Sequence, residues 1–385
     1  MKAVITSDNH LNKYYSKMRP NQLEERRKQI AEQFGKVVDY TIEEDADLFL
    51  HCGDLFDMPN PRNPPVSYVG RKLVELEKNG IPSFLVVGNH DKPKMTTGAG
   101  GSSPQEIYES FEVGHVFRDA NQIETETVEV DGLEVAISGI SHNPLLDDGE
   151  DPLQGKSVDT DADVSILLAH YGVEDHLAGR TNEPIISHGS VDSLDIDVLC
   201  SGHIHKRADL SVGSTEIIVP GATERMGFGE IDRDTGFYAL SAENGETETE
   251  YIGLEPQPMQ EETISANGLK EDNATKKVLE TVNQVSEPEQ IFKLRFEGTL
   301  TRDQYHRLDI HQIWDQGRNS NFYFDLVDDI EFEVDDRVEL GGERLSQVEE
   351  LKRVAEQVEE SAEDDEKEIV REARKMVLSD YGGGR

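Results

Sequence analysis

The chain has 385 residues, of which 38 are Lys or Arg and 79 are Asp or Glu, so its formal net charge is −41. This length allows two or three domains, and the apolar residues lie in compact runs bounded by turn signals, which excludes a chain that is disordered throughout. Two cysteines are too few for a disulfide framework and are typical of a reducing cytoplasm. The charge argues at first against an anionic partner such as nucleic acid or acidic lipid.

The acidic excess belongs to the later part of the chain. Residues 1–100 contain 14 basic and 14 acidic residues, and residues 101–385 contain the remaining 24 and 65. Two interpretations stay open: a surface adapted to a salt-rich cytoplasm, as in a halophilic archaeon, or an acidic module that binds a partner. No apolar run approaches the ~20 residues that span a bilayer, and the N-terminus has no secretory signal, so we predict a cytoplasmic protein without membrane contact.

Residues 1–221 alternate short apolar runs with helical patterns. The runs and the three- and four-residue spacing of apolar side chains predict strands at 3–6, 47–52, 82–87, 134–140, 164–170, 197–202 and 216–221, and helices at 22–44 and 66–79. Because the strand runs are almost continuously apolar, we expect both of their faces to be covered. The alternating order predicts a layered α/β sandwich.

The later part of the chain is predicted to add a hairpin and smaller units. In chain order the patterns predict an acidic loop at 145–163, a hairpin at 237–252 around Asn244-Gly245, a polar linker at 255–290, a strand at 291–298, a helix at 301–316, one or two strands at 321–334 and a helical stretch at 344–378. We expect a small β-α-β unit near 258–340. The apolar stripe of the last helical stretch requires a partner surface.

Side chains of metal-ligand type follow five of the predicted strands. They are Asp8 and His10, Asp54, Asn89 with His90 and Asp91, His170, and His203 with His205. Since the carboxyl ends of strands in α/β sheets face one crevice, we expect these side chains to meet. Glycine precedes three of the groups, at Gly53, Gly88 and Gly202, where the backbone must turn tightly and admit a ligand.

The predicted ligands are carboxylates, imidazoles and one amide, without a thiolate cluster. This mixture suits Mn²⁺, Fe²⁺ or Zn²⁺ at a reactive centre rather than a structural zinc site. The candidate groups outnumber the positions around one ion, so we predict a two-metal centre, which activates water and stabilises charge at phosphorus. Each motif alone is more often an ordinary turn, but the five in order after five strands indicate a site.

In order and spacing these motifs resemble those of the calcineurin-like metallophosphoesterases, over residues 1–221. The resemblance implies a four-layer α-β-β-α metallophosphoesterase sandwich in which Asp54 bridges two metals. It implies the ligands Asp8, His10 and His205 for one ion, and Asn89, His170 and His203 for the other. It also implies that His90 stabilises the pentacovalent phosphorus or assists the leaving oxygen, and that Asp91 orients the ring of His90.

A narrower resemblance extends to the SbcD-type DNA double-strand-break repair nucleases, the relatives of the meiotic-recombination-eleven nuclease. It rests on the segment Pro-Gly-Ala-Thr-Glu-Arg-Met-Gly-Phe-Gly-Glu at 220–230 and on Gly-Phe-Tyr at 236–238. It implies a Mn²⁺-dependent exonuclease and endonuclease that processes DNA ends, with Mg²⁺, Fe²⁺ or Zn²⁺ as alternative metals. It further implies a homodimer that works with an SbcC-like SMC-type ATPase.

The same resemblance implies a division of the chain into three parts. These are a nuclease domain (1–254), a linker with a small β-α-β capping domain (255–340), and a C-terminal helical segment that binds the ATPase (341–385). The cap is expected to bury Trp314 and the aromatic residues of 322–324 in its core.

The chain departs from the family pattern beside the predicted site. Asn12 stands where Gly is frequent, and 57–62 reads Asp-Met-Pro-Asn-Pro-Arg in place of a polar run with an Arg. We predict contacts with the DNA backbone by the basic residues Lys13, Lys17, Arg19, Arg62 and Arg225. We expect ordinary surface histidines at His115, His142, His176 and His188.

Two other functions stay open at this point. An enzyme of the same fold could act on small phosphate esters or nucleotides, although the segment at 220–230 and the cap argue against it. The chain could also be a scaffold with an idle metal site, whose C-terminal helices recruit the ATPase. The complete set of predicted ligands argues against the scaffold.

Overall fold

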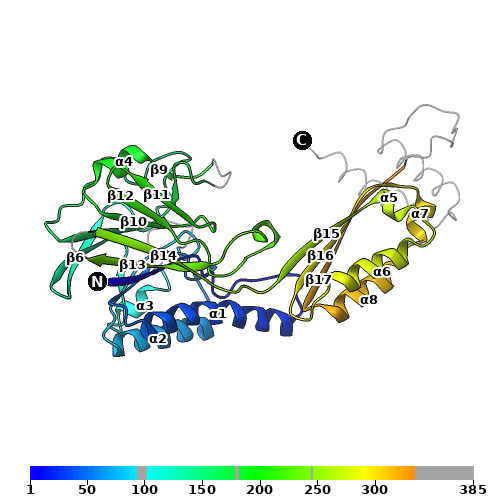
Figure 1. Cartoon of the computed structure of the whole chain (residues 1–385), viewed down its shortest axis with the longest axis horizontal. Helices are drawn as coiled ribbons and strands as arrows, with labels where there is room; N and C mark the ends of the chain where they lie inside the picture. The colour runs from blue at the N-terminus through cyan, green and yellow to red at the C-terminus, as the bar shows by residue number, and fades with distance from the viewer. Residues whose placement is uncertain (93–101, 178–181, 244–245, 334–385) are drawn as a thin grey trace, which may run out of the picture. The chain divides into compact units, whose positions relative to one another are not determined.

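The computed structural model describes residues 1–92, 102–177, 182–243 and 246–333. It contains two six-stranded sheets and, later in the chain, a three-stranded sheet (Figure 1). Within these residues, no helix has the length and apolar character needed to cross a bilayer. The predicted turn at 244–245 and the helical stretch at 344–378 lie outside the described residues.

The first sheet has the strand order β14-β13-β1-β2-β3-β4, in which β1 to β4 are parallel and β13 and β14 add antiparallel strands. Its strands are β1 (Lys2–Thr6), β2 (Leu48–His51), β3 (Ser83–Val86), β4 (His115–Phe117), β13 (Gly236–Glu243) and β14 (Glu246–Gly253). The helices α1 (Pro20–Glu43) and α2 (Asn63–Lys78) follow β1 and β2 and lie side by side on one face (Figure 1). The short helix α3 (Glu106–Glu109) precedes β4.

The second sheet has the strand order β11-β12-β10-β7-β6-β5. Its strands are β5 (Glu124–Val130), β6 (Leu133–Gly139), β7 (Val164–His170), β10 (Val198–Gly202), β11 (Ala208–Val212) and β12 (Thr215–Val219). Its outer face is covered by the six-residue helix α4 (His188–Ser193), by loops, and by the short pair β8 (Gly172–Val173) and β9 (Ile185–Ile186). A 3₁₀ turn, η1 (Phe228–Glu230), precedes β13.

Side chains along the central strands alternate between two cores. In β1, Ile5 packs between the two sheets whereas Val4 packs against α1 and α2. In β7, Ile166 and Leu168 face the first sheet, and Leu167 faces the outer layer. Strands covered on both faces read as continuous apolar runs, which is why they were recognisable in the sequence. The predicted α-β-β-α order of layers is confirmed, with a fourth layer made of one short helix and loops.

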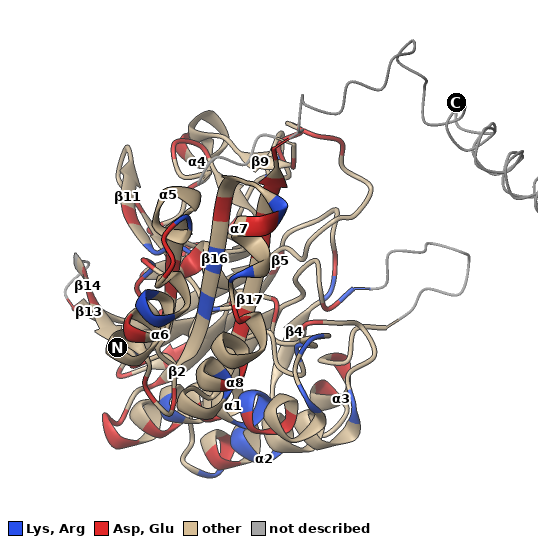
Figure 2. Cartoon of the chain, turned by 90° about the vertical axis from the view of Figure 1, so that its right-hand side faces the viewer, with Lys and Arg blue, Asp and Glu red and all other residues tan. Residues whose placement is uncertain are grey.

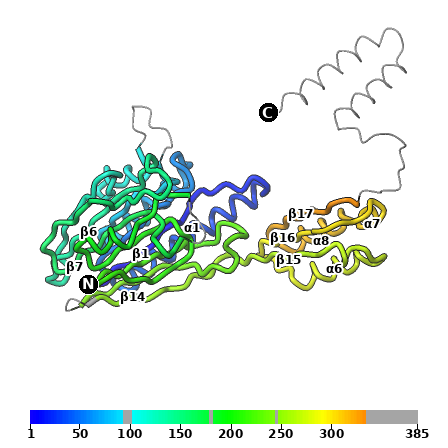
Figure 3. The backbone as a smooth tube through the Cα atoms, turned by 90° about the horizontal axis from the view of Figure 1, so that it is seen from above, coloured from blue at the N-terminus to red at the C-terminus, as the bar shows by residue number. Residues whose placement is uncertain are grey.

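The three-stranded unit (residues 259–332) has a β-α-β-α-β order. Its elements are β15 (Met259–Ser265), α5 (Ala266–Leu269), α6 (Ala274–Val285), β16 (Ile291–Leu300), α7 (Arg302–His306), α8 (Ile310–Ser320) and β17 (Tyr323–Phe332). α6 and α8 lie next to each other beside this sheet (Figures 1 and 3) and close its core. The prediction of a polar linker at 255–290 is therefore wrong where β15, α5 and α6 lie. The sequence of α6 resembles a linker because it is polar on all but the narrow face of Val278 and Val282.

Two finer predictions about this unit are also wrong. The helix expected at 301–316 is broken into α7 and α8, since Thr301 and Asp309 each accept a hydrogen bond from a backbone N–H three residues later and so cap separate helices. Trp314 is 39% exposed and stacks on Arg318 rather than lying in the core. Phe324 is buried, as expected.

A buried ion pair connects α1 with the segments that precede and follow β13 and β14. Arg26 and Glu224 have fully buried side chains, and Arg26 Nη1 lies 3.2 Å from Glu224 Oε2. Arg26 also donates to the side-chain oxygen of Gln257, whose backbone N–H donates to Glu224. Both charges are thus satisfied at the point where the chain leaves the two-sheet body for β15.

Replacing Arg26 with Met should lower the free energy of unfolding by about 3–5 kcal/mol, because Glu224 is left as an unpaired buried charge. Adding Glu224→Gln should recover much of the loss. Lys28→Met on the same helix is the control, since Lys28 pairs with the exposed Glu25 and Glu32. Urea unfolding of the four proteins measures the effect. Equal stability of Arg26→Met and Lys28→Met would contradict the assignment.

Candidate metal centre

The loops that follow β1 and β2 run side by side and carry the first predicted ligands. The backbone N–H of Asp8 donates to the carbonyl of Gly53, and that of His10 donates to the carbonyl of Asp54, both at 3.0 Å. Asp8, His10 and Asp54 all have positive φ, at 53°, 46° and 54°, and so does His203, at 86°. Non-glycine residues rarely adopt this region, and such backbone persists where the surrounding structure enforces it. The strand ends are thus locally strained at predicted ligands.

Two glycines allow the predicted ligands to approach one another. Gly53 has a φ of +89°, and a Cβ there would lie 2.5 Å from His170 Nδ1. A Cβ on Gly88 would lie 2.2 Å from Asp54 Oδ1. Both contacts are shorter than any side chain tolerates, so these positions require glycine for the reason that the sequence suggested.

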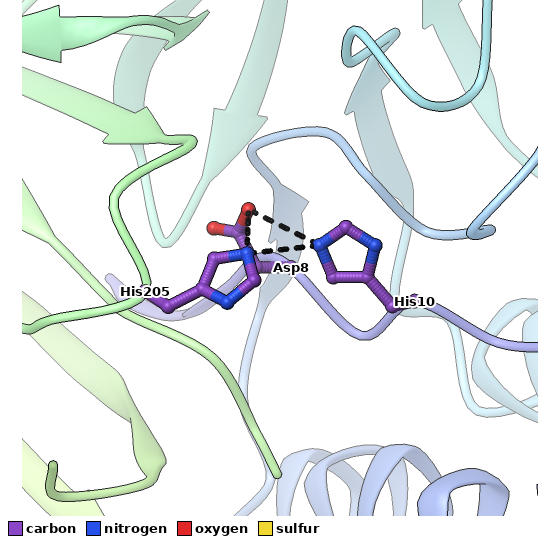
Figure 4. Close-up of side chains that lie close together, drawn as sticks. All are labelled: Asp8, His10 and His205. Atoms are coloured by element: carbon purple, nitrogen blue, oxygen red, sulfur yellow. Dashed lines mark hydrogen bonds and ion pairs between the residues drawn. The ribbon is translucent and has the colours of Figure 1, made fainter. Parts of the chain in front are cut away.

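The first cluster consists of Asp8, His10 and His205 (Figure 4). The two imidazole Nε2 atoms lie 2.9 Å apart, and Asp8 Oδ1 lies 3.6 Å from that of His205 and 4.0 Å from that of His10. Ligand atoms bound ~2.1 Å from one ion lie roughly 3.0–3.4 Å from one another. The three side chains therefore form a group that fits a divalent cation.

The second cluster consists of Asp54, Asn89, His170 and His203. Nε2 of His170 lies 3.2 Å from Asp54 Oδ2 and 3.1 Å from Asn89 Oδ1, which in turn lies 2.9 Å from His203 Nδ1. Asp54 Oδ2 also lies 3.6 Å from His10 Nε2 in the first cluster. One carboxylate oxygen is thus common to both clusters, and all seven predicted ligands are brought together.

The two aspartates direct one oxygen each toward the clusters. Asp8 Oδ2 accepts hydrogen bonds from the Ser7 hydroxyl at 2.6 Å and the His203 backbone N–H at 3.0 Å. Asp54 Oδ1 accepts from the His90 backbone N–H at 2.8 Å. Asp8 Oδ1, which shares the His203 N–H at 3.2 Å, and Asp54 Oδ2 are the oxygens that face the imidazoles. Such preorientation is what metal-binding carboxylates require.

The charge balance of the buried groups also fits a cation. Burial alone would raise the pKa of Asp54, but the adjacent His170 imidazole holds that pKa well below its usual range. Burial likewise opposes protonation of His170, yet the Asp54 carboxylate raises the pKa of His170 to about 9. A buried carboxylate requires a positive partner, and a bound metal ion would take the place of the imidazole proton.

His90 lies at the open side of the first cluster. Its side chain is exposed, its ring packs edge-on against His10 with centroids 4.8 Å apart, and its Nδ1 lies 3.2 Å from the carbonyl oxygen of Asp57. The contacts of Asp91 differ from the predicted one with the His90 ring. Its buried carboxylate accepts from the backbone N–H groups of Leu55, Phe56 and Gly88 and from the side chain of Gln105. Asp91 thus connects the loops that follow β2 and β3 rather than orienting the imidazole ring of His90.

The predicted DNA-contacting residues lie in varied surroundings. Lys13 donates to Asp57 at 2.8 Å, and Lys17 is mostly exposed and pairs with Asp325. Arg19 forms a hydrogen bond with Gln22, and Arg225 donates to the carbonyl of Arg233. Arg62 is exposed at the start of α2. Lys17, Arg19 and Arg62 are the exposed members of this set.

Sequence reasoning missed several residues around the clusters. His142, expected on the surface, is half-buried and stacks on Tyr171 at 5.0 Å beside His203, and burial lowers its pKa to about 3. His51 is fully buried in β2 and bonds to Asn9, whose side chain reaches Thr223. The acids Asp57, Glu183 and Glu230 lie behind the imidazoles. Asp57 and Glu230 belong to the segments 57–62 and 220–230 noted in the sequence, but no local pattern shows that the three acids face imidazoles.

Asp54→Ala should abolish high-affinity binding of both divalent ions, because its carboxylate faces both clusters. His205→Ala should weaken one site, whose other ligands Asp8 and His10 remain, and leave the other site unchanged. Isothermal titration with Mn²⁺ would report the stoichiometry, with the exposed His306→Ala as control. Two intact sites in Asp54→Ala would contradict the shared role.

The comparisons with known proteins agree with this geometry. Residues 1–207 match the family of calcineurin-like phosphoesterases. The DNA double-strand break repair protein Mre11 of Sulfolobus acidocaldarius is 30% identical over 238 residues, 60% of this chain and 57% of that protein. The proteins of the same name from Sulfurisphaera tokodaii and Haloferax volcanii are both 27% identical, over 76% and 60% of this chain and 72% and 47% of theirs. The chain thus spans little more than half the length of the first of these relatives. Because the family match covers more than half of its residues, the chain belongs to the calcineurin-like phosphoesterases.

Proposed function

We propose that this chain is a two-metal DNA phosphodiesterase, an exonuclease and endonuclease that processes double-strand-break ends with Mn²⁺. The observation that carries the proposal is the pair of clusters sharing Asp54, with the exposed His90 beside them. The similarity to proteins named for DNA double-strand break repair supports DNA as the substrate. Mg²⁺, Fe²⁺ and Zn²⁺ are chemically compatible with the same ligands.

The residues divide the chemistry of phosphodiester cleavage among them. Two divalent ions held by the clusters would activate water and neutralise the charge that develops at phosphorus. His90 is free to approach a phosphate oxygen, where its imidazole would stabilise that charge or deliver a proton to the leaving oxygen. The backbone N–H of His90 donates to Asp54, and Asp91 holds the N–H of Gly88, so the imidazole stays beside the clusters.

DNA would be held by short-range contacts rather than by long-range attraction. Acidic residues occur on elements throughout the view of Figure 2, among them α3 and α7, and basic ones are interspersed with them on α1 and α2. In molar salt, charges are screened within ~3 Å, so a distant acidic surface neither attracts nor repels DNA effectively. Exposed Arg62 and Lys17 would contact phosphates directly.

The proposal includes the wider assembly and its setting. The chain would act in the cytoplasm as a homodimer, with an SbcC-like ATPase bound by residues 341–385, which lie outside the described residues. The nuclease domain would be residues 1–254, and the capping domain would lie within residues 255–340.

Mn²⁺ should support digestion of an end-labelled DNA duplex at high salt, and His90→Asn should slow cleavage by about 10²–10⁴-fold while leaving metal binding intact. His306→Asn, an exposed histidine of α7, is the matched control. Turnover of bis-p-nitrophenyl phosphate is measured in parallel. If the wild type hydrolyses the ester but cleaves no DNA under any divalent ion, the chain is a phosphodiesterase of small esters rather than a nuclease. If the wild type has neither activity, the scaffold hypothesis is favoured.

DNA affinity should fall only weakly between low and molar salt, because few phosphate contacts release counterions. Fluorescence anisotropy with a labelled duplex and Ca²⁺ in place of Mn²⁺ measures the slope of log affinity against log salt. Arg62→Gln should weaken binding and reduce this slope by about one unit, whereas Arg318→Gln beside Trp314 should not. A steep wild-type slope would show that long-range attraction dominates after all.

A further inference from the structure

Each histidine of the two clusters turns one ring nitrogen toward the cluster and the other away from it. The outer contacts are Asp57 Oδ1 at 3.3 Å from His10 Nδ1, Glu183 Oε2 at 2.8 Å from His203 Nε2, Glu230 Oε1 at 2.6 Å from His205 Nδ1, and the carbonyl oxygen of Cys52 at 2.6 Å from His170 Nδ1. Three of the four imidazoles therefore have a carboxylate behind them.

A carboxylate at the outer nitrogen decides where a neutral imidazole carries its proton. The ring has one N–H and one lone pair, and an acceptor holds the N–H on its own side. The lone pair then lies on the inner nitrogen, where it would be available to a cation. The same contact fixes the rotation of the ring and makes the inner nitrogen a stronger donor.

We propose that Asp57, Glu183 and Glu230 are positioning residues, which hold three imidazoles in the tautomer and orientation that bind a divalent cation. This inference rests on the metal-dependent function proposed above. The three carboxylates belong to separate segments: the loop after β2, the segment before β9, and η1. The clusters would thus depend on loops beyond the five strand ends that carry the ligands.

The three acids differ from ordinary surface carboxylates of this chain. Their side chains are only 14–15% exposed. Glu230 also accepts a hydrogen bond from the Met226 backbone N–H at 2.7 Å, and Asp57 accepts one from Lys13 at 2.8 Å. These contacts hold the carboxylates of Glu230 and Asp57 in place. The low exposure of all three acids limits their solvation, so that their charge acts on the imidazoles more strongly than in water.

The geometry also ranks the three carboxylates. Those of Glu183 and Glu230 are within hydrogen-bond distance, whereas the Asp57 contact with His10 is longer and lacks hydrogen-bond alignment. Asp57 has a second connection, because its carbonyl oxygen lies 3.2 Å from His90 Nδ1. We expect the largest effects on metal affinity from the two glutamates.

The test is Mn²⁺ affinity of the full chain by titration calorimetry at constant high salt. Glu183→Gln and Glu230→Gln keep the size of the side chain but remove its charge, and each should weaken one site by about 10–100-fold. Asp57→Asn should have a smaller effect. The matched control is Glu216→Gln, an acid at the opposite end of the second sheet that accepts hydrogen bonds from Thr247 and Thr249. Wild-type affinity in both glutamate variants would overturn the proposal.

A double-variant comparison separates positioning from general damage. If Glu230 acts through His205, then Glu230→Gln should cost no further affinity in a His205→Ala background. An equal loss in both backgrounds would show that Glu230 does not act through this ring. Thermal unfolding without metal reports whether a variant folds, and if Glu230→Gln does not, Glu183→Gln in its separate segment decides.

The readout also distinguishes this inference from the proposed function. Metal affinity is measured without DNA, so an enzyme that fails to cleave DNA but shows the expected affinity pattern would disprove only the nuclease. DNA cleavage with unchanged affinity in the glutamate variants would disprove only the positioning role.

Discussion

The position of one carboxylate, that of Asp54, is the constraint on which the candidate site depends. One of its oxygens accepts a hydrogen bond from the backbone of His90, and the other faces both clusters. Its place is set by two parallel loops that exchange backbone hydrogen bonds and by a neighbouring glycine that leaves room for it. A shift of this group would separate the two clusters from each other and from His90, so the strained backbone at the strand ends is required by their common geometry.

Much of the two-sheet body could be predicted because its physics is local. A strand covered on both faces must be apolar at nearly every position, and the runs around Ile5, Leu50 and Leu168 carry that signature in a few consecutive letters. The ligands were recognisable for the same reason, since each follows such a run directly. The order of the strands within each sheet carries no such signature, because pairing is decided by contacts between distant segments.

Other features could not be predicted from the sequence, because their roles depend on contacts between distant segments. Glu183 and Glu230 are two acids among 79, and although Glu230 ends the segment at 220–230, nothing in the sequence shows that either acid faces an imidazole. The helix α6 reads as a linker because its few apolar residues stand among polar ones, and only the packed unit shows that they cover the sheet. Trp314 was expected in a core on size and apolarity alone, but it covers an arginine at the surface, where its ring still finds a favourable partner.

The distance along the chain between His10 and His205 has a consequence for how the protein is made. Their facing nitrogens belong to residues 195 positions apart. At roughly 5–20 residues per second of synthesis, the ribosome needs on the order of 10–40 s to supply the second imidazole after the first. During that interval the emerging chain holds carboxylates and imidazoles that have no complete cluster to join. Assembly of the two clusters is therefore a late event, because each cluster includes a histidine from the segment that follows β10.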